Sequence, residues 1–167
     1  MRDLAGRLAV VTGGGSGMGR ELVRQLASAG CHVATCDVSD DGLRDTRQSA
    51  DQGAPSGTIV STFRADVADE GQVRGFRDFV AAEHNVDHIN LLFNNAGIGA
   101  GGSFVVDDRA EWDATFAVCW GGVYACLRTF LPMLLASDEG HVVNTSSANG
   151  FWAVSYTHLT LPTILRV

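Results

Sequence analysis

Short apolar runs alternate along the first 146 residues with longer segments in which apolar residues recur every three or four positions. The first pattern predicts buried strands and the second predicts amphipathic helices, and their alternation is typical of an α/β protein with a parallel sheet. The predicted strands are Arg7–Thr12, His32–Cys36, Thr58–Ala65, His88–Phe93 and His141–Thr145. The predicted helices lie near Gly17–Ala29, Asp41–Gln52 and Asp69–His84, with a long helix or a pair of helices from Arg109 to Ala136.

The helix starts are marked by capping residues, at Ser39-Asp40 for the second helix and within Asp66–Asp69 for the third. A length of 167 residues indicates one domain, and no internal repeat interrupts the pattern. Right-handed crossovers then predict a doubly wound, Rossmann-like sheet that binds its ligand at the carboxyl ends of the strands.

A glycine-rich segment, Thr12–Gly19, joins the first predicted strand to the first predicted helix. A strand, a glycine turn and a helix make a phosphate cradle, because backbone N–H groups approach the ligand and the helix N-terminus supplies partial positive charge. The glycine spacing is G-x-x-x-G-x-G, and a plain tight turn is the alternative reading of it. The candidate phosphate-binding residues are Gly13, Ser16, Gly17, Met18 and Gly19.

An acidic residue, Asp37, ends the second predicted strand, 18 residues after Gly19. In a dinucleotide-binding unit, an acidic side chain at this place accepts hydrogen bonds from the adenosine ribose. Its carboxylate would bind a free 2′-hydroxyl and repel a 2′-phosphate. The alternative is that Asp37 caps the helix that follows it.

The charge of the chain disfavours polyanionic partners. Twelve basic residues, all of them arginine, stand against 19 acidic residues, for a net charge of −7. Nucleic acids and anionic membranes both favour clustered positive charge, so we expect neither as a partner. We also expect no membrane-spanning segment, no signal peptide at Met1-Arg2-Asp3, and a cytoplasmic location.

The cysteines form no CxxC pair and no metal-ligand pattern with the five histidines. We therefore expect them to be buried small residues in a reducing compartment, and we expect no metal site. The four cysteines are Cys31, Cys36, Cys119 and Cys126.

Four landmarks in order and spacing make this sequence resemble the short-chain dehydrogenase/reductase family. They are Thr12–Gly19, Asp37, the pair Asp66-Val67 and the segment Asn94-Asn95-Ala96-Gly97. A fifth, Val143–Ser147, is similar to the strand that carries the family's catalytic serine, and the resemblance extends from residue 4 to about residue 153.

The resemblance implies an incomplete doubly wound sheet that retains strands in the order 3-2-1-4-5. It implies that Asp66 and Val67 contact the adenine ring, and that Asn94, Ala96 and Gly97 line the cofactor and steady the central strand. Family members that bind NADP commonly carry a basic residue at the position of Ser16 or just after the second strand. Here Ser16 and Cys36–Val38 hold none, so the resemblance implies NAD, with Val38 beside Asp37 at the adenosine.

The family's chemistry is hydride transfer between the nicotinamide and a carbonyl or alcohol carbon. A tyrosinate acts as general base or acid, a lysine lowers its pKa, and a serine binds the substrate oxygen. Ser147 matches that serine, although a hydroxyl that merely satisfies a strand end is the alternative. The family's asparagine, which helps to hold a relay water, is expected within Phe116–Val123, where Cys119 stands. A thiol does not reproduce the paired donor and acceptor of an amide.

The family's Y-x-x-x-K motif, expected a dozen or more residues after the serine, does not occur. The one tyrosine after Ser147 is Tyr156, which Thr160 follows four residues later, and the chain contains no lysine. Tyr156 also precedes a threonine-rich stretch ending at Pro162, which is a poor helix former. We therefore reject Tyr156 as the catalytic tyrosine.

The last segment, 154–167, resembles translated sequencing adapter. One back-translation of Val154–Thr163 resembles the transposon end and read adapter of a tagmentation library. We therefore expect residues 1–153 to be a truncated NAD-binding domain and 154–167 to be a non-native tail, with a natural divergent C-terminus as the alternative. The fifth strand would then be an exposed edge, and the fragment would aggregate easily.

The leading functional hypothesis is an NAD-preferring oxidoreductase for a small alcohol or ketone, of which this chain is an incomplete and inactive form. The alternative is a noncatalytic dinucleotide-binding or sensor protein of the same fold. A third hypothesis, an extended epimerase-like relative, fits the glycine spacing less well. The substrate is a small molecule, and a complete parent protein is expected to be a homo-oligomer.

Overall fold

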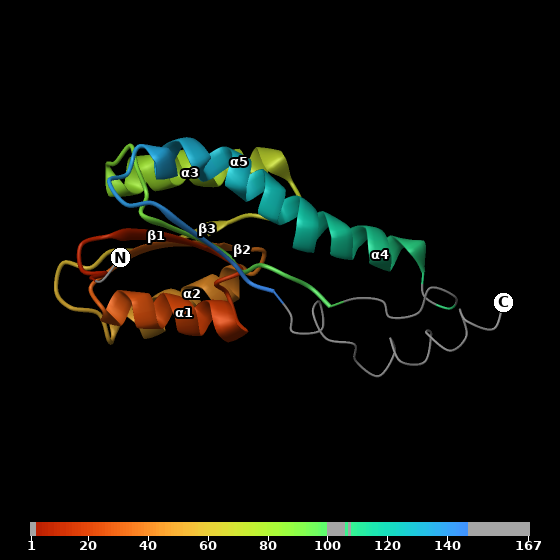
Figure 1. Cartoon of the computed structure of the whole chain (residues 1–167). Coiled ribbons are helices and arrows are strands. Elements are labelled where there is room, and N and C mark those ends of the chain that lie inside the picture. Colours follow the sequence, from red (N-terminus) through yellow and green to blue (C-terminus); the bar gives the residue numbers. More distant parts are fainter. Residues whose placement is uncertain (1–2, 100–105, 107, 147–167) are drawn as a thin grey trace, which may run out of the picture.

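A computed structural model of the chain describes residues 3–99, 106 and 108–146. Five parallel strands form one sheet in the order β3-β2-β1-β4-β5 (Figure 1). This confirms the predicted α/β class and strand order. The strands are β1 (Leu8–Thr12), β2 (His32–Asp37), β3 (Val60–Arg64), β4 (Leu91–Asn94) and β5 (His141–Asn144).

Helices cover both faces of the sheet. Figure 1 shows α1 (Gly17–Ser28) and α2 (Asp40–Asp51) on one face, with α3 (Glu70–His84) and α5 (Gly122–Leu135) on the other. Helix α4 (Arg109–Phe116) and the π-helical turn η1 (Ala117–Gly121) run directly into α5. The three form one long helix, as the apolar pattern between Arg109 and Ala136 predicts. The α4 end of this helix projects beyond the sheet (Figure 1).

Alternate side chains of β1 pack into two different apolar layers. Val10 lies in one cluster with Phe76 of α3 and Phe130 of α5. Val11 lies in the other cluster, with Val23 of α1. All five side chains are buried, and each contributes about 1.5–3 kcal/mol by leaving water. The run of β1 is uniformly apolar because both faces of this strand are covered.

Helices α2 and α3 begin at the predicted caps. Ser39 Oγ accepts a hydrogen bond from Gly42 N at 3.1 Å. Asp69 Oδ1 accepts from Gly71 N at 2.7 Å and from Gln72 N at 3.1 Å. The side-chain amide of Gln72 and these two backbone N–H groups hold the pKa of Asp69 below its usual value. Each cap satisfies donors that the first helical turn leaves unpaired.

Strands β3 and β4 are shorter than predicted, and begin at Val60 and Leu91. Pairing with β2 begins at Val60, and pairing with β1 begins at Leu91. Just before Leu91, the Ile89 N–H donates to Met133 O at the end of α5, and not to a neighbouring strand. The apolar pattern continues through Ile89 because this residue is buried in the core, not because it lies in the sheet.

One described helix, Arg109–Leu135, is long and apolar enough to cross a membrane by length and composition, with a hydropathy of 1.4. The expectation that no apolar segment is long enough to span a bilayer is therefore wrong by length and composition. The finding is weak evidence for a membrane span, because core helices pass the same test. Phe130 and Leu134 of this helix lie in the core cluster under the sheet.

Candidate functional site

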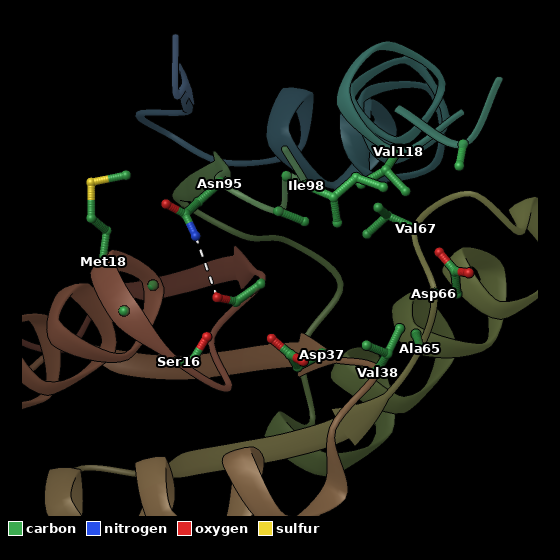
Figure 2. A pocket seen from close by; sticks show the side chains of 16 residues that line it. Ser16, Met18, Asp37, Val38, Ala65, Asp66, Val67, Asn95, Ile98 and Val118 are labelled. Carbon is green, nitrogen blue, oxygen red and sulfur yellow. Dashed lines mark hydrogen bonds between the residues drawn. The ribbon is translucent and has the colours of Figure 1, made fainter. Parts of the chain in front are cut away.

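A cleft of about 570 Å³ lies at the carboxyl ends of the strands (Figure 2). The segments that follow β1, β2, β3 and β4 all reach it, and η1 contributes Val118. The structure thus brings together nearly all of the predicted cofactor-binding residues. Those that line the cleft are Gly13, Ser16, Gly17, Met18, Gly19, Asp37, Val38, Asp66, Val67, Ala96 and Gly97.

Glycines of the loop occupy positions where a side chain does not fit. A Cβ on Gly13 would lie 2.7 Å from Ala96 Cα, and one on Gly19 would lie 2.0 Å from Gly13 O. Gly13 also has a φ of +70°, in the left-handed region that other residues rarely adopt. The loop is therefore closed tightly on itself and on the segment after β4.

The backbone N–H groups of the loop fall into two sets. Gly13 N and Gly14 N donate to Cys36 O at 2.8 and 3.1 Å, and Gly15 N donates to Asp37 Oδ2 at 2.9 Å. At the start of α1, by contrast, the N-cap Ser16 makes no side-chain cap, and the first turn holds no acidic residue.

The first N–H groups of α1 therefore have no capping side chain as their acceptor. They lie at the positive end of the helix dipole. A bound diphosphate would satisfy these donors. The residues present thus fit a dinucleotide, with its phosphates at the start of α1.

Asp37 connects the glycine loop to the start of α2. Its Oδ2 accepts from Gly15 N, and its Oδ1 accepts from Ser39 N at 3.0 Å. Ser39 is the N-cap of α2, so the alternative in which Asp37 caps this helix is wrong. A Cβ on Gly15 would lie 2.6 Å from Asp37 Cγ, which explains the glycine there. Figure 2 shows the Asp37 carboxylate in the wall of the cleft, beside Val38.

Asp66 and Val67 form the wall after β3. Asp66 Oδ1 accepts from Ala68 N at 2.9 Å, and Asp66 N donates to Gln72 Oε1 at 3.0 Å. Val67 is buried, and a Cβ on Gly122 would lie 2.6 Å from its Cγ2. Val67 therefore fills the space between the cleft and α5, and presents an apolar surface that suits a planar ring.

Asn95 lines the cleft, whereas the sequence reasoning selected its neighbour Asn94. Asn95 Nδ2 donates to Thr12 O at 3.1 Å, and the N–H groups of Asn95 and Ala96 both donate to Thr12 Oγ1 at 3.0 Å. The repeated Asn-Asn was a signal for both residues. Because alternate residues of a strand face opposite sides, the choice between them depended on the register of β4.

Asn94 joins the sheet instead. Its Nδ2 donates to Asn144 Oδ1 of β5 at 2.8 Å, in agreement with the expected role of steadying the central strand. Its Oδ1 is buried and has no hydrogen-bond partner in the described chain. Asn94 lines a second cavity of about 340 Å³ that shares Met18, Asn95, Ala96 and Gly97 with the cleft.

Cys119 also lines this second cavity, from the π-helical turn η1. Its thiol donates to Ile98 O at 3.4 Å. Cys119 is exposed, so the expectation that all four cysteines are buried is wrong for this one and confirmed for the other three. No residue of the π-helical turn is buried, although Val118, beside Cys119, packs against the core cluster. Among the described residues, no group of three or more His, Cys, Asp or Glu could hold a metal ion.

The predicted catalytic residue Ser147 lies outside the described residues, as do Tyr156 and the segment 154–167. The described chain ends at Ser146, which lines the second cavity together with Thr145.

The model of the short chain dehydrogenase family matches residues 7–159. The chain belongs to the short-chain dehydrogenase/reductase family. A curated relative from Mycobacterium tuberculosis, the putative oxidoreductase SadH, is 36% identical over 154 residues, which cover 92% of this chain and 54% of the relative. The levodione reductase of Leifsonia aquatica is 34% identical over 86% of this chain and 53% of its own length. The chain spans about half the length of these relatives.

Solved structures of the family superpose closely on this fold. A short-chain dehydrogenase/reductase from Burkholderia phymatum in complex with NAD has a TM-score of 0.83 and 31% identity, over 99% of this chain and 60% of that one. A metagenomic short-chain oxidoreductase in complex with NADP has a TM-score of 0.80 and 32% identity, over 93% and 70%. The family and the cleft together support a nicotinamide dinucleotide as the cofactor.

Proposed function

We propose that this protein prefers NAD over NADP. The observation that carries the proposal is the Asp37 carboxylate, held in the cleft wall by the N–H groups of Gly15 and Ser39. A phosphate group carries about −1.5 to −2 charges at neutral pH, so a carboxylate at this position repels the 2′-phosphate of NADP. A free 2′-hydroxyl instead donates to the remaining lone pairs of Asp37.

The basic side chain that contacts this wall supports the same choice. Arg64 Nε donates to Val38 O at 3.2 Å and lies 3.5 Å from Asp40 Oδ2. Arg64 thus pairs with Asp40, whereas the Asp37 carboxylate is held by two backbone N–H groups, so this wall of the cleft keeps a negative charge.

The test compares NADH and NADPH dissociation constants for the parent chain and for Asp37→Ala. We expect the parent to prefer NADH by at least about tenfold, and Asp37→Ala to weaken NADH about 5- to 20-fold and to remove most of the preference. Asp41→Ala is the matched control, because it removes an exposed carboxylate that pairs with Arg44 on α2. Equal or tighter NADPH binding by the parent, or an unchanged preference in Asp37→Ala, contradicts the proposal.

We further propose a small alcohol or ketone as the substrate. A nicotinamide cofactor, when bound, exchanges a hydride with such a carbon. Membership of the family supports this class, and the name of levodione reductase indicates a ketone for that relative. In this chain Ser147 would hydrogen-bond the substrate oxygen, while Cys119 takes the place at which the family carries an asparagine.

The 167-residue chain itself, we propose, binds the dinucleotide weakly and does not turn over. It contains no lysine, and Thr160 stands four residues after Tyr156, so a Y-x-x-x-K pair is missing. We assign residues 1–153 to the family's domain and 154–167 to translated sequencing adapter. Detectable dehydrogenase activity of the purified chain would refute the first statement. A genomic sequence that continues through the codon of Ala153 into this same tail would refute the second.

A noncatalytic dinucleotide sensor is the second candidate, and Cys119 in the place of the family's asparagine favours it. Recovery of the coding sequence after Ala153 decides between the two, because Y-x-x-x-K is then present or missing. For either candidate, the net charge of −7 favours a small molecule over nucleic acid or an anionic membrane. We propose a cytoplasmic location and a homo-oligomeric parent protein.

A further inference from the structure

Arg20, the residue after the last glycine of the loop, links that loop to α2. Its Nη2 donates to Gly15 O at 2.6 Å and lies 3.4 Å from Gly42 O. Its Nε donates to Thr46 Oγ1 at 3.0 Å, and Nη2 lies 3.7 Å from Asp45 Oδ2. The guanidinium therefore spans from the glycine loop to the first two turns of α2.

Thr46 completes this link from the other side. Its side chain is fully buried, and its hydroxyl lies 2.7 Å from Gly14 O and 2.9 Å from Gly42 O while it accepts from Arg20. A buried hydroxyl needs such partners, because leaving it unpaired is costly. Two consecutive carbonyls of the loop are thus held by side chains: Thr46 of α2 binds Gly14 O, and Arg20 of α1 binds Gly15 O.

The peptide groups on either side of Gly15 are consequently both held, the one before it through Gly14 O and Gly15 N, and the one after it through Gly15 O. The N–H of Gly15 donates to Asp37, and its carbonyl accepts from Arg20. Helix α2 also packs closely against this carbonyl, since a Cβ on Gly42 would lie 2.6 Å from Gly15 O. Asp37 takes one of its two backbone hydrogen bonds from Gly15, so a rotation at Gly15 would release one carboxylate oxygen.

We propose that Arg20, supported by Thr46, is a positioning residue for cofactor choice. It holds the Gly15 carbonyl, so that the Gly15 N–H aims at Asp37 and the Asp37 carboxylate stays where it meets the adenosine ribose. Arg20 touches neither the ribose nor the nicotinamide in this role. The inference rests on the proposed preference for NAD and adds the device that maintains it.

The simpler role for Arg20 is to pack α1 against α2. That role predicts equal losses for NADH and NADPH, together with a lower melting temperature. Positioning of Asp37 predicts instead that NADH binding falls, while NADPH binding changes little, because weaker attraction of the ribose accompanies weaker repulsion of the 2′-phosphate. The ratio of the two dissociation constants therefore separates the two roles.

The experiment measures NADH and NADPH dissociation constants by ligand-observed NMR, which reads weak binding, with the melting temperature of every variant. We expect Arg20→Met to weaken NADH about tenfold and to change NADPH by less than about threefold, with partial rescue in Arg20→Lys. Thr46→Val should shift the ratio in the same direction and Thr46→Ser should restore it.

Gly42→Ala perturbs the same carbonyl without removing a charge. Alanine favours a helix more than glycine does, so this variant separates loss of helix stability from displacement of the loop. We expect it to weaken NADH more than NADPH. Arg24→Met is the matched control on α1, because Arg24 pairs with Glu21 at 2.8 Å on the exposed side of this helix, and its ratio should stay within about twofold of the parent.

Asp37→Ala separates failure of the inference from failure of the proposed function. If Asp37→Ala lowers the NADH preference but Arg20→Met, Thr46→Val and Gly42→Ala keep it, the positioning role is overturned and the NAD proposal stands. If Asp37→Ala also keeps the NADH preference, the NAD proposal fails. The NAD proposal fails as well if the unsubstituted chain binds neither dinucleotide. If Arg20→Met does not fold, Thr46→Val and Gly42→Ala decide.

Discussion

Single side chains in the cleft each connect two segments that are distant in the sequence. Thr12 Oγ1 accepts from the N–H groups of Asn95 and Ala96, which joins the end of β1 to the segment after β4. Asp37 joins the glycine loop to the start of α2. The walls of the cleft are therefore joined by individual hydrogen bonds, each of which contributes about 1 kcal/mol.

Cys119 provides a test of the cleft at the scale of one residue. Burial raises the pKa of Cys31 to about 11 and of Cys126 to about 12, and raises that of Cys36 well above its usual value. Because the thiolate is the reactive form, these three thiols should not react near pH 8. We expect a maleimide to modify about one thiol per native chain and all four after denaturation.

Bound NADH should slow this reaction, because the cavity at Cys119 shares Met18, Asn95, Ala96 and Gly97 with the cleft. Mass spectrometry of the labelled chain identifies the site, and Cys119→Ser is the control that should leave the native chain unlabelled. Rapid labelling of a second cysteine in the native chain would show that the fold described above does not hold in solution.

At the scale of elements, the end of the sheet opposite the cleft holds a pair of histidines. His84, in the last turn of α3, lies 2.7 Å from Ser61 Oγ of β3 through Nε2. The ring of His32 in β2 packs edge-on against it, with centroids 6.3 Å apart, and His32 Nδ1 accepts from Ile59 N at 3.1 Å. Burial first, and then the charge of His32, lower the pKa of His84, while Glu83 opposes the shift.

The lowered pKa of His84 makes stability depend on pH in a defined direction. Below the unfolded pKa of 6.5 the unfolded chain binds a proton that the folded chain resists, so folding loses free energy as the pH falls from 6.5 toward the folded pKa. Above pH 6.5 this contribution is fully present. We expect the melting temperature to fall between pH 7.5 and 5.5, and His84→Gln, which stays neutral, to reduce the slope.

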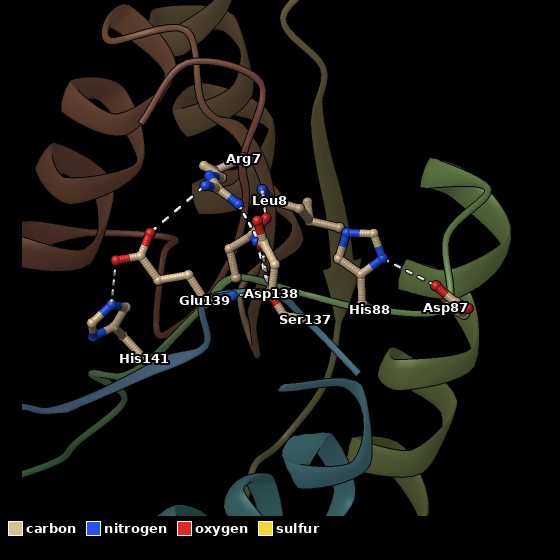
Figure 3. A network of polar contacts seen from close by, with 9 residues as sticks. Arg7, Leu8, Asp87, His88, Ser137, Asp138, Glu139 and His141 are labelled. Atoms are coloured by element: carbon tan, nitrogen blue, oxygen red, sulfur yellow. Dashed lines mark hydrogen bonds and ion pairs between the residues drawn. The ribbon is translucent and has the colours of Figure 1, made fainter. Parts of the chain in front are cut away.

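The control for this pH dependence is His88→Gln. His88 is partly exposed and pairs with Asp87 at 3.0 Å (Figure 3). Comparison of the slopes of His88→Gln and His84→Gln shows whether the change is specific to His84. A His84→Gln variant with the full slope of the parent would exclude His84 as its cause.

At the scale of the whole molecule, polar contacts and apolar contacts both join distant parts of the chain. They contribute unequally to the free energy of unfolding. Arg7, at the start of β1, lies 2.6 Å from Asp138 and 3.7 Å from Glu139, in the connection between α5 and β5, and Glu139 lies 3.5 Å from His141 (Figure 3). Asp138 and His141 are exposed to water, and Arg7 and Glu139 are partly exposed. Phe130 makes the corresponding apolar link, since it packs against Phe76 with ring centroids 5.7 Å apart and is fully buried.

Paired substitutions measure this difference. Phe130→Ala should lower the free energy of unfolding by about 3–5 kcal/mol, because it removes a large buried ring and leaves a cavity. Arg7→Met should lower it by less than about 1 kcal/mol, because water reaches and screens this partly exposed ion pair. Urea unfolding followed by circular dichroism compares them. A larger loss from Arg7→Met than from Phe130→Ala would contradict the assignment of the core.

The exposed apolar surface belongs to the same scale. Val142 and Val143 of β5 are 40% and 44% exposed, and Trp120 of the long helix is 68% exposed. Strand β5 lies at the edge of the described sheet, as the strand order of the family implied. Such an edge offers unpaired backbone groups to other chains, which supports the expectation that the isolated chain aggregates easily.

The sequence by itself determined the strands, the helices, the class of the fold and the chemical type of the ligand. Apolar periodicity, capping residues and the spacing of the glycine loop are local properties, and Asp37 ends β2 at a distance along the chain from the glycine loop that local geometry sets. The apolar run Leu8–Val11 was enough to predict a buried strand.

Only the tertiary structure decided which neighbour faces the cleft and which partners hold it. Asn94 and Asn95 are identical in sequence terms, and the pairing of β4 with β1 and β5 separated them. The exposure of Cys119 depended on where the long helix leaves the sheet. The hydrogen bonds of Arg20 to Gly15 and Thr46 join segments that no periodic pattern relates, because contacts across a fold depend on packing geometry and not on spacing along the chain.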